Sequence, residues 1–492
     1  MKKYHLIGKC LTISVILLFV GTCIIPSNAH DTEKPSQSTS RGNWLYVGGN
    51  GPGNYTRIQD AINDSQDGDT VFVYDDSSPY YEILIVNTSI DLIGENKDTT
   101  IIDGGVGEYV DVVSIVSDWV TISGFTIQNS SIYCVGIELY SCYNTISGNI
   151  ITHNDDGIRM MKNSAYNNVT GNTISNNSYD GIGLYGDDNI IADNIIISNR
   201  KDGIESVGDH NTILENKITN HTFALDLRDS NVYIIIGNTI SSNSWSGIEI
   251  QNSSNTVISD NIISHSSYGI RGYSSFSHNV IRDNIITLNE HESIGIGSDS
   301  NYNIISDNEL SKNGGGIILD WYANYNNLSG NTIKWNLGEG IELQDSNFNT
   351  IRGNRIGRNN GSGIDVMLDS NNNSITDNII YSNRYGLLLA VRCGNNTICG
   401  NTISNNTGGI CLIISTNNTI SRNNFVYNKL NAVFFVSDKN IWKQNFWNRP
   451  RFLPKVIFGI RIQVHSGMQI PCPGIDIDLH PAKEPYNIPG MS

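Results

Sequence analysis

The chain has 492 residues, which is more than one compact core usually contains, and only 16% of them are charged. The formal net charge is −17. This balance excludes nucleic acid and anionic lipid surfaces as partners, because binding to either requires clustered basic residues. A repeat protein escapes the size limit on a single core, because each repeat packs only against its neighbours.

The first 29 residues have the pattern of a signal peptide. Three lysines precede an apolar run over residues 11–25, and Ala29 ends a small-residue cleavage site. The run is short for a membrane span, so a retained anchor ranks second and lipid attachment at Cys23 ranks third. We therefore expect an exported protein, extracellular or on the cell surface, with no membrane span after the signal is removed.

A flexible linker and a short helix are predicted next. Residues 30–42 are polar and rich in Ser and Thr, which is typical of a flexible linker. Within residues 54–65, Ile58, Ala61 and Ile62 recur at helical spacing. We expect this segment to be a short amphipathic helix that closes the first coil of the domain.

Asparagine then recurs every 22 to 24 residues, and a large apolar residue follows two positions later each time. Two further polar columns, mostly asparagine, lie five residues before and five residues after each of these asparagines. A repeat this regular predicts about a dozen similar coils. The recurring asparagines are Asn149, Asn172, Asn194, Asn216, Asn238, Asn261, Asn284, Asn308, Asn331, Asn354, Asn378, Asn401 and Asn423.

Within each coil, apolar and polar residues alternate over short stretches, as in Gly157-Ile158-Arg159-Met160. That alternation is strand periodicity. Asn and Gly tolerate the left-handed backbone of sharp corners, so each coil is predicted to hold three short strands bounded by these residues. Stacked asparagine side chains would form hydrogen-bonded ladders. The predicted fold is an all-β, right-handed parallel β-helix over residues 43–440.

The C-terminal residues 441–492 differ from the coils. They contain five tryptophan and phenylalanine residues and several prolines, a composition that predicts an irregular cap over the last coil. Covering that coil would block edge-to-edge association. The tryptophans and phenylalanines of this predicted cap are Trp442, Phe446, Trp447, Phe452 and Phe458.

Four segments and the coils that follow them resemble a known family. The segments are IQDAI at 58–62, GDTV at 68–71, IDG at 102–104 and VTISGFTI at 120–127. Together with the Asn/Gly-Ile coils they resemble the NosD-like β-helix proteins of the pectin-lyase-like superfamily. The resemblance implies a right-handed β-helix. It also implies carbohydrate binding, polysaccharide cleavage or copper delivery, all of which occur in that superfamily.

One outward column carries acids on three consecutive coils: Glu205, Asp226 and Glu249. Adjacent strands place such side chains about 4.8 Å apart, and stacked like charges cost stability. Arg228 and Arg271 lie beside this column and can offset the repulsion.

These five residues and Tyr273 form a candidate ligand-binding surface for polysaccharide or Ca²⁺. Asp226 and Glu249 are the candidate catalytic pair if the protein is a polysaccharide lyase or glycoside hydrolase. The alternative, which we favour, is a solvated acidic face without catalysis. The Asp-Pro-His-Asp run of the superfamily's mannuronate epimerases does not occur in the sequence.

Copper binding requires imidazole or sulfur ligands that converge. Histidines within the coils fall in different columns or distant coils, whereas the C-terminal tail carries His465, Met468, Cys472 and His480 close in sequence. These four are the candidate copper ligands. The six cysteines after the signal show no zinc spacing, and they indicate no disulfide pairing.

We expect a secreted or cell-surface repeat protein that binds polysaccharide or a cell-surface glycan, or acts as a scaffold, without catalysis. Two alternatives stay open: a lyase or hydrolase acting through outward carboxylates, and a NosD-like periplasmic protein that binds or delivers copper. Near the C-terminus, residues 475–478 and 480–486 resemble the tails of archaeal surface proteins of this family. The resemblance implies an archaeal source. The sequence indicates no particular oligomeric state.

Overall fold

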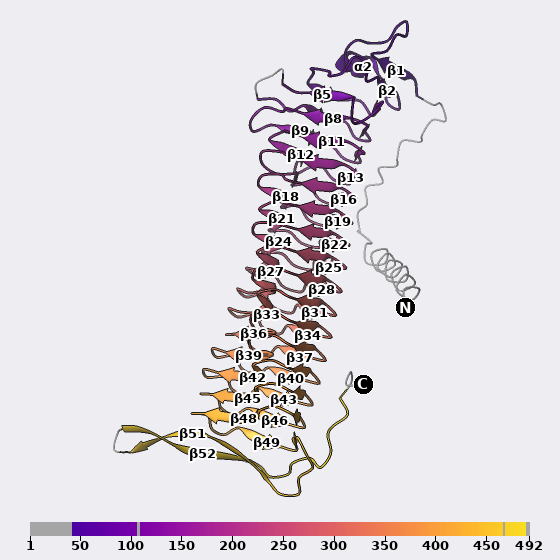
Figure 1. The fold of residues 1–492 in the computed structure, drawn as a ribbon. Coiled ribbons are helices and arrows are strands. Elements are labelled where there is room, and N and C mark those ends of the chain that lie inside the picture. Colours follow the sequence, from indigo (N-terminus) through magenta and orange to yellow (C-terminus); the bar gives the residue numbers. More distant parts are fainter. Residues whose placement is uncertain (1–41, 106–108, 466–467, 489–492) are drawn as a thin grey trace, which may run out of the picture. The chain divides into compact units, whose positions relative to one another are not determined.

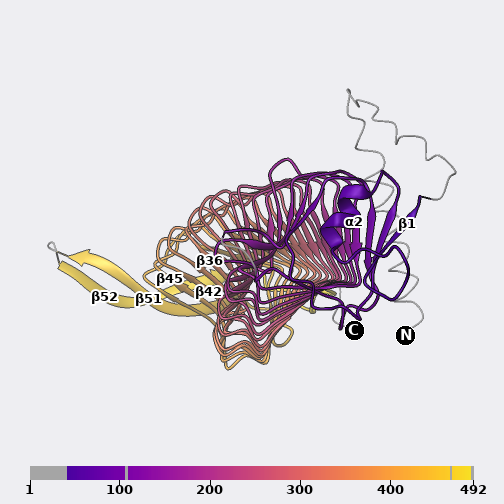
Figure 2. The same cartoon turned by 90° about the horizontal axis from the view of Figure 1, so that it is seen from above.

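The computed structural model describes residues 42–488 except 106–108 and 466–467, and the side chains of residues 463–470 also lie outside the description. The signal peptide and most of the linker, residues 1–41, therefore lie outside the described residues. The described chain forms a right-handed parallel β-helix with one short helix, which confirms the predicted fold (Figure 1). The coils follow one another closely when seen along the stack (Figure 2).

Three parallel sheets, called A, B and C here, run the length of the stack. Sheet A has 18 strands and sheet B has 16. In stacking order, sheet A consists of β1 (Trp44–Val47), β2 (Thr70–Val73), β4 (Asp91–Gly94), β7 (Thr121–Ser123), β10 (Thr145–Ser147), β13 (Asn168–Thr170), β16 (Ile190–Ala192), β19 (Thr212–Leu214), β22 (Ile234–Ile236), β25 (Val257–Ser259), β28 (Val280–Arg282), β31 (Ile304–Ser306), β34 (Asn327–Ser329), β37 (Thr350–Arg352), β40 (Ser374–Thr376), β43 (Thr397–Cys399), β46 (Thr419–Ser421) and β49 (Ile441–Lys443).

Sheet B consists of β5 (Ile101–Asp103), β8 (Thr126–Gln128), β11 (Ile150–Thr152), β14 (Thr173–Ser175), β17 (Ile195–Ile197), β20 (Lys217–Thr219), β23 (Thr239–Ser241), β26 (Ile262–Ser264), β29 (Ile285–Thr287), β32 (Glu309–Ser311), β35 (Thr332–Lys334), β38 (Arg355–Gly357), β41 (Ile379–Tyr381), β44 (Thr402–Ser404), β47 (Asn424–Val426) and β50 (Phe446–Trp447). Sheet C consists of β3 (Leu84–Val86), β6 (Val113–Ile115), β9 (Val135–Leu139), β12 (Asp156–Met160), β15 (Ile182–Leu184), β18 (Asp202–Ser206), β21 (Phe223–Arg228), β24 (Ser246–Gln251), β27 (Tyr268–Tyr273), β30 (Glu292–Ile296), β33 (Gly315–Leu319), β36 (Ile341–Gln344), β39 (Ile364–Met367), β42 (Tyr385–Ala390), β45 (Gly408–Ile413), β48 (Leu430–Phe435), β51 (Lys455–His465) and β52 (Met468–Asp478).

The core is a set of stacked aliphatic columns inside the coil. In sheet A, Ile146 pairs with Val169, and Val169 pairs with Ile191, and all three side chains are fully buried. Burying one such side chain stabilises the fold by about 1.5–3 kcal/mol. Each strand is too short to be stable alone, so stability comes from the repetition of these contacts from coil to coil.

Asparagine ladders line the corners of the coils. The Oδ1 atom of Asn172 accepts hydrogen bonds from the backbone N–H of Asn149 at 2.9 Å and from its Nδ2 at 3.2 Å. Asn149 Nδ2 also donates to the carbonyl oxygen of Ile122 at 2.9 Å. The residue before each asparagine turns the corner with a positive φ, as in Gly148 and Gly171. Each buried amide thus satisfies backbone groups that the corner leaves unpaired.

His221 interrupts the ladder between sheets B and C. Its Nδ1 atom lies 3.1 Å from the carbonyl oxygen of Asn199, and its Nε2 atom lies 3.2 Å from that of Ile196. Burial lowers the pKa of His221, so the ring is neutral and can donate to only one of these two oxygens.

Replacing His221 with asparagine should therefore raise the free energy of unfolding by about 1 kcal/mol, because it restores an amide with two donors and one acceptor. Urea unfolding of the variant tests this. The reverse change one coil away, Asn243→His, should lower stability by a similar amount. A destabilised His221→Asn variant would contradict this account of the ladder.

Both ends of the stack are covered. At the N-terminal end the helix α2 (Ile58–Asp64) buries Ile58, Ala61 and Ile62, as the sequence predicts. At the other end, β49 and β50 continue sheets A and B beyond residue 440, where the sequence places the start of the cap. Trp442 and Trp447 are buried in this final coil.

The cap is more regular than the sequence predicts. Strands β51 and β52 form an antiparallel hairpin, and β51 pairs with β48 at the end of sheet C (Figures 1 and 2). Phe452 and Phe458 are exposed rather than packed over the last coil. The last coil is instead hydrogen-bonded to Asp476, Asp478 and Ala482, at and after the end of the hairpin.

The asparagine ladder ends on Asp478, which is fully buried. Its Oδ2 atom accepts hydrogen bonds from the backbone N–H of Asn445 at 2.9 Å and from Trp447 Nε1 at 3.1 Å. Its Oδ1 atom accepts one from the backbone N–H of Gln444 at 3.1 Å. The aspartate thus occupies the place that the next coil's asparagine would take.

Candidate functional site

The outer face of sheet C carries the column of acids that the sequence singles out. Glu205 pairs with Asp226, Asp226 with Glu249, and Glu249 with Arg271, on the neighbouring strands β18, β21, β24 and β27. Side-chain alternation directs these residues outward while Ile204, on the same strand as Glu205, lies in the core. The structure therefore places four of the predicted site residues side by side.

Asp226 and Glu249 lie beneath arginines. Asp226 is 1% exposed and accepts two hydrogen bonds from Arg228, one of them from Nε at 3.0 Å. Glu249 is 5% exposed; Arg271 Nη1 lies 3.3 Å from its Oε1, and Ser246 Oγ donates to its Oε2 at 2.5 Å. A general acid or nucleophile must reach the bond it acts on. These two carboxylates face their own arginines, so the geometry does not favour them as a catalytic pair.

Two tyrosines flank the arginine at the end of this column. The Arg271 guanidinium lies 4.5 Å from the ring centroid of Tyr268 and 5.6 Å from that of Tyr273. Such cation–π contacts hold the guanidinium in place over Glu249. Glu249 raises the pKa of Tyr273 in addition to the effect of burial, which brings that pKa to about 12, so the phenol stays protonated and can donate a hydrogen bond.

Three charged residues that the sequence analysis missed complete the next cluster. Lys201 Nζ lies 3.4 Å from Asp180, 3.2 Å from Asp202 and 3.2 Å from Glu205. Tyr185 donates a hydrogen bond to Glu205 at 3.0 Å. The available signal was the repeated Asp-Gly-Ile at the start of three consecutive strands.

Those aspartates form a short ladder of their own. Asp156 Oδ1 accepts the backbone N–H of Asp180, and Asp180 Oδ1 accepts that of Asp202, each at 3.0 Å. Burial raises the pKa of Asp180 to about 8 and that of Asp202 to about 6. Lys201 lowers the pKa of Glu205 despite the opposing effect of burial. The ammonium of Lys201 is the counter-ion of this group.

A third cluster of the same kind lies two coils earlier. Arg159 Nη1 lies 3.4 Å from Glu138, and Arg159 Nη2 makes a short contact with Asp156. The Tyr140 hydroxyl donates to Glu138. Burial raises the pKa of nearby Asp111 to about 7, and Glu138 adds to this effect.

Along this face the acids form the lower layer and the cations and phenols form the upper one. Arg228 has 46% of its side chain exposed, whereas its partner Asp226 has 1%. Lys201 and Arg271 are likewise more exposed than the carboxylates they contact. A molecule that approaches sheet C between β9 and β27 therefore meets guanidinium, ammonium and phenol groups before it meets carboxylates.

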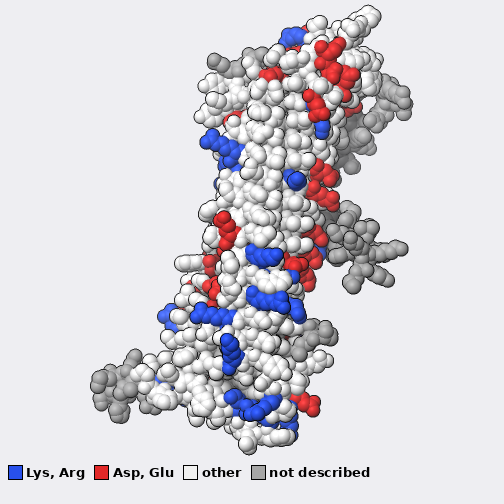
Figure 3. Space-filling view, in the orientation of Figure 1, with Lys and Arg blue, Asp and Glu red and all other residues white. Residues whose placement is uncertain are grey.

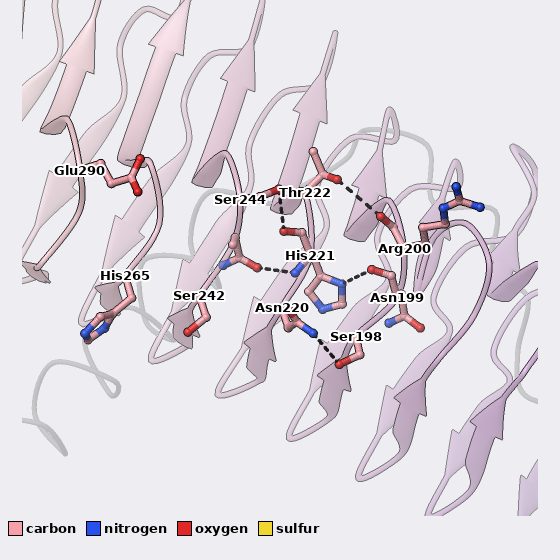
Figure 4. Close-up of a pocket in the computed structure, with 11 residues that line it drawn as sticks. Ser198, Asn199, Arg200, Asn220, His221, Thr222, Ser242, Ser244, His265 and Glu290 are labelled. Carbon is pink, nitrogen blue, oxygen red and sulfur yellow. Dashed lines mark hydrogen bonds between the residues drawn. The ribbon is translucent and has the colours of Figure 1, made fainter.

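A shallow hollow of about 660 Å³ lies beside this face, at the corner that leads from sheet B to sheet C (Figure 4). Small hydroxyl and amide side chains line it, and the buried ring of His221 lies at its base. Asn220 Nδ2 donates to Ser198 Oγ at 2.9 Å across it. The remaining lining residues are Asn199, Arg200, Thr222, Ser242, Asn243, Ser244, His265 and Glu290.

A second basic surface lies on the C-terminal coils. Figure 3 shows Lys and Arg side chains gathered in the lower half of the visible face. The coils of this half contain Arg355 and Arg384, whose guanidinium groups lie 5.0 Å and 5.7 Å from the rings of Tyr381 and Tyr385. Because neither arginine lies on the sheet C column of acids, they offer a control for the role of Arg228 and Arg271.

Comparison with known families decides the membership of this chain. The family described as periplasmic copper-binding protein (NosD) matches residues 62–246 and 316–453, and the right-handed β-helix region matches residues 223–380. The chain belongs to the NosD family. No curated protein matches the sequence of this family member.

Several solved structures are similar to this NosD-family chain at low sequence identity. The A-module of mannuronan C-5 epimerase AlgE6 from Azotobacter vinelandii is 12% identical, with 78% of this chain and 94% of that one covered and a TM-score of 0.41. The periplasmic alginate epimerase AlgG is 14% identical, with 70% and 83% covered and a TM-score of 0.41. The GH87 α-1,3-glucanase from Streptomyces thermodiastaticus is 12% identical, with 62% of each chain covered and a TM-score of 0.44.

The described residues of this NosD-family chain bring one group of possible metal ligands close together. Among them, one group of three or more His, Cys, Asp or Glu side chains has ligand atoms within 4.8 Å of one another: Asp180, Asp202 and Glu205. Carboxylate oxygens are hard ligands, whereas copper in proteins is bound by imidazole, thiolate or thioether groups. Of the predicted copper ligands, Cys472 lies in β52 and His480 is exposed beyond it, and the side chains of His465 and Met468 lie outside the described part.

In the part of the chain that the structure describes, no helix has the length and apolar character needed to cross a membrane.

Proposed function

We propose that this NosD-family protein binds a neutral, hydroxyl-rich polysaccharide along the outer face of sheet C, between β9 and β27, without cleaving it. The observation that supports this is the layering of the face: exposed arginine, lysine and tyrosine groups above buried, ion-paired carboxylates. Guanidinium and phenol groups donate hydrogen bonds to sugar hydroxyls, and aromatic rings pack against sugar rings. The coils repeat at about 4.8 Å, so the groups form a line that a linear chain can follow.

Charge favours a neutral ligand over an anionic one. The face carries Arg159, Lys201, Arg228 and Arg271 but a larger number of acids beneath them. Each cation is thus already neutralised by a carboxylate of the protein. A polyanion would compete with those internal partners and would meet the field of a chain whose net charge is −17.

The test is retention of the full chain on a panel of neutral and acidic polysaccharides, with parallel assays for released reducing or unsaturated ends. The double variant Arg228→Lys and Arg271→Lys keeps both positive charges over Asp226 and Glu249 but removes the planar forks. We expect it to bind roughly tenfold more weakly, a loss of about 1.4 kcal/mol.

The matched control changes Arg355 and Arg384 to lysine, which removes one guanidinium group from sheet B and one from the corner before β42, both outside the part of sheet C between β9 and β27. This control should bind like the wild-type protein. Equal binding by the sheet C variant would exclude the proposed face. Release of new ends from any polysaccharide would exclude a non-catalytic role and make Glu205, which is less deeply buried than the other paired carboxylates of the face, the next residue to change.

A second candidate function is copper binding by the C-terminal tail, which family membership favours. Titration of Cu(I) into the full chain and into a His465→Ala, Met468→Ala variant tests it. The double substitution leaves Asp478 and the cap in place, which a deletion of the tail would not. Equal binding of Cu(I) by the two proteins would end this proposal.

A further inference from the structure

A second set of acids lies farther along the outer face of sheet C, beyond the proposed polysaccharide face. We call it the distal acidic group, and it lies on β30, β36 and β39, directly after β33 and just before β36. Its members are Glu292, Asp320, Glu339, Glu342 and Asp365.

Two of the distal acids, Glu342 and Asp365, lie directly side by side. Glu342 and Asp365 are paired directly on neighbouring strands, so their side chains leave the sheet on the same side. The Oε1 atom of Glu339 lies over Gly361, only 2.5 Å from where a Cβ atom would be, at the start of the coil that carries Asp365. A Cβ atom at position 361 would also lie only 2.8 Å from the backbone carbonyl carbon of Gly338, so the glycine leaves room for the Glu339 carboxylate at this point.

The distal group differs from the rest of the face in its counter-ions. Every acid of the column from Glu205 to Glu249 contacts a lysine or an arginine. Within the described residues, no ion pair joins any member of the distal group to a basic side chain. Glu342 Oε1 accepts a hydrogen bond from the neutral amide of Gln344, whose Nε2 atom lies 2.5 Å away.

Asp365 is the member that most needs a partner. It is 5% exposed, and its Oδ1 atom is buried without a hydrogen-bond partner. A buried carboxylate without a counter-ion is costly, so it must either hold a proton or face a cation. Burial raises the pKa of Asp365 to about 8, with Glu339 and Glu342 adding to the effect, which reflects the missing positive charge.

We propose that the paired carboxylates of Asp365 and Glu342, with Glu339 on the coil of Glu342, bind a divalent cation from solution, with Ca²⁺ preferred over Mg²⁺. Ca²⁺ takes 6–8 oxygen ligands with flexible geometry, and water can supply most of them, which suits two carboxylates on neighbouring coils. Mg²⁺ demands a stricter octahedron. Asp180, Asp202 and Glu205 form a tighter group, but they already contact the ammonium of Lys201. A metal ion bound there would have to displace this ammonium.

The experiment is calorimetric titration of CaCl₂ into the full chain near neutral pH, with thermal unfolding in matched concentrations of CaCl₂ and MgCl₂. Wild-type protein should bind Ca²⁺ and unfold at a higher temperature in its presence. The variants Asp365→Asn and Glu342→Gln should each weaken binding by roughly tenfold or more. The control Glu309→Gln, an exposed acid paired with Lys334 on sheet B, should bind as the wild-type protein does.

Two results would overturn the proposal. The first is no heat and no thermal shift with millimolar Ca²⁺, which would mean that Asp365 is neutralised by a proton alone. The second is binding that survives both Asp365→Asn and Glu342→Gln, or that is lost instead in Glu205→Gln, which would place the ion elsewhere. Two independent variants keep the test valid if one of them fails to fold.

Discussion

Replacing Asp478 with alanine should lower the free energy of unfolding by about 3–5 kcal/mol, because buried donors of the last coil lose a charged acceptor. The carboxylate accepts hydrogen bonds from Gln444, Asn445 and Trp447, and no water reaches it, since Asp478 is fully buried. The loss should begin at the C-terminal coils, since each coil of a solenoid depends on its neighbours.

Urea unfolding and amide hydrogen exchange measure this effect. Exchange should accelerate first in the strands next to the cap, β46, β47, β49 and β50. The control is Asp478→Asn, which keeps one acceptor oxygen for Asn445 and Trp447 and should cost far less. If alanine and asparagine had the same small effect, the ladder would not depend on its terminal acceptor.

Replacing Asp365 with asparagine should stabilise the metal-free protein at about pH 8 and remove the pH dependence of stability that Asp365 contributes. The pKa of Asp365 rises from its ordinary value of 3.8 to about 8 because of burial and of the neighbouring Glu339 and Glu342. Between these two values the folded chain holds a proton that the unfolded chain has released. Stability is therefore fully present below about pH 4 and is lost as the pH rises towards 8.

At high pH the free energies of unfolding of the wild type and of Asp365→Asn should differ by a few kcal/mol, because each unit of pKa shift corresponds to about 1.4 kcal/mol. Thermal unfolding in a chelator from acidic to mildly basic pH measures it. The two proteins should converge at low pH, where both side chains are neutral. Adding Ca²⁺ at the basic end should restore wild-type stability but leave the variant unchanged. Parallel pH profiles would contradict the assignment of this proton to Asp365.

The sequence by itself predicts the coil architecture, and the structure confirms it at the level of single residues. Asn149 and its equivalents lie in ladders, and Ile151 and its equivalents lie in the core. The helix over residues 58–64 is also readable, from the spacing of three apolar residues. These features are predictable because a solenoid repeats the same local pattern, so each position is sampled many times along one chain.

Only part of the candidate site could be predicted from the sequence. The column of Glu205, Asp226 and Glu249 follows from strand alternation and repeat length. That Arg228 covers Asp226, and that Lys201 neutralises three carboxylates at once, depends on side-chain rotamers and on residues about one coil apart. Sequence spacing predicts which column of stacked residues a charged side chain belongs to, but not whether that side chain is buried or exposed. A buried carboxylate and an accessible one therefore look alike before folding.

The sequence alone determined the fold, the three-strand coil and the row of charges on sheet C, because periodicity sets which face each residue occupies. The tertiary structure alone decided which charges are paired and where the stack ends. Asp478 lies at the end of the hairpin of β51 and β52. The hairpin brings it back to the last coil, where it bonds to Asn445, 33 residues earlier in the chain. Asp365 became visible as a candidate cation ligand only when its neighbours were seen to include acids and no base. Both facts depend on contacts between distant segments, which no local pattern records.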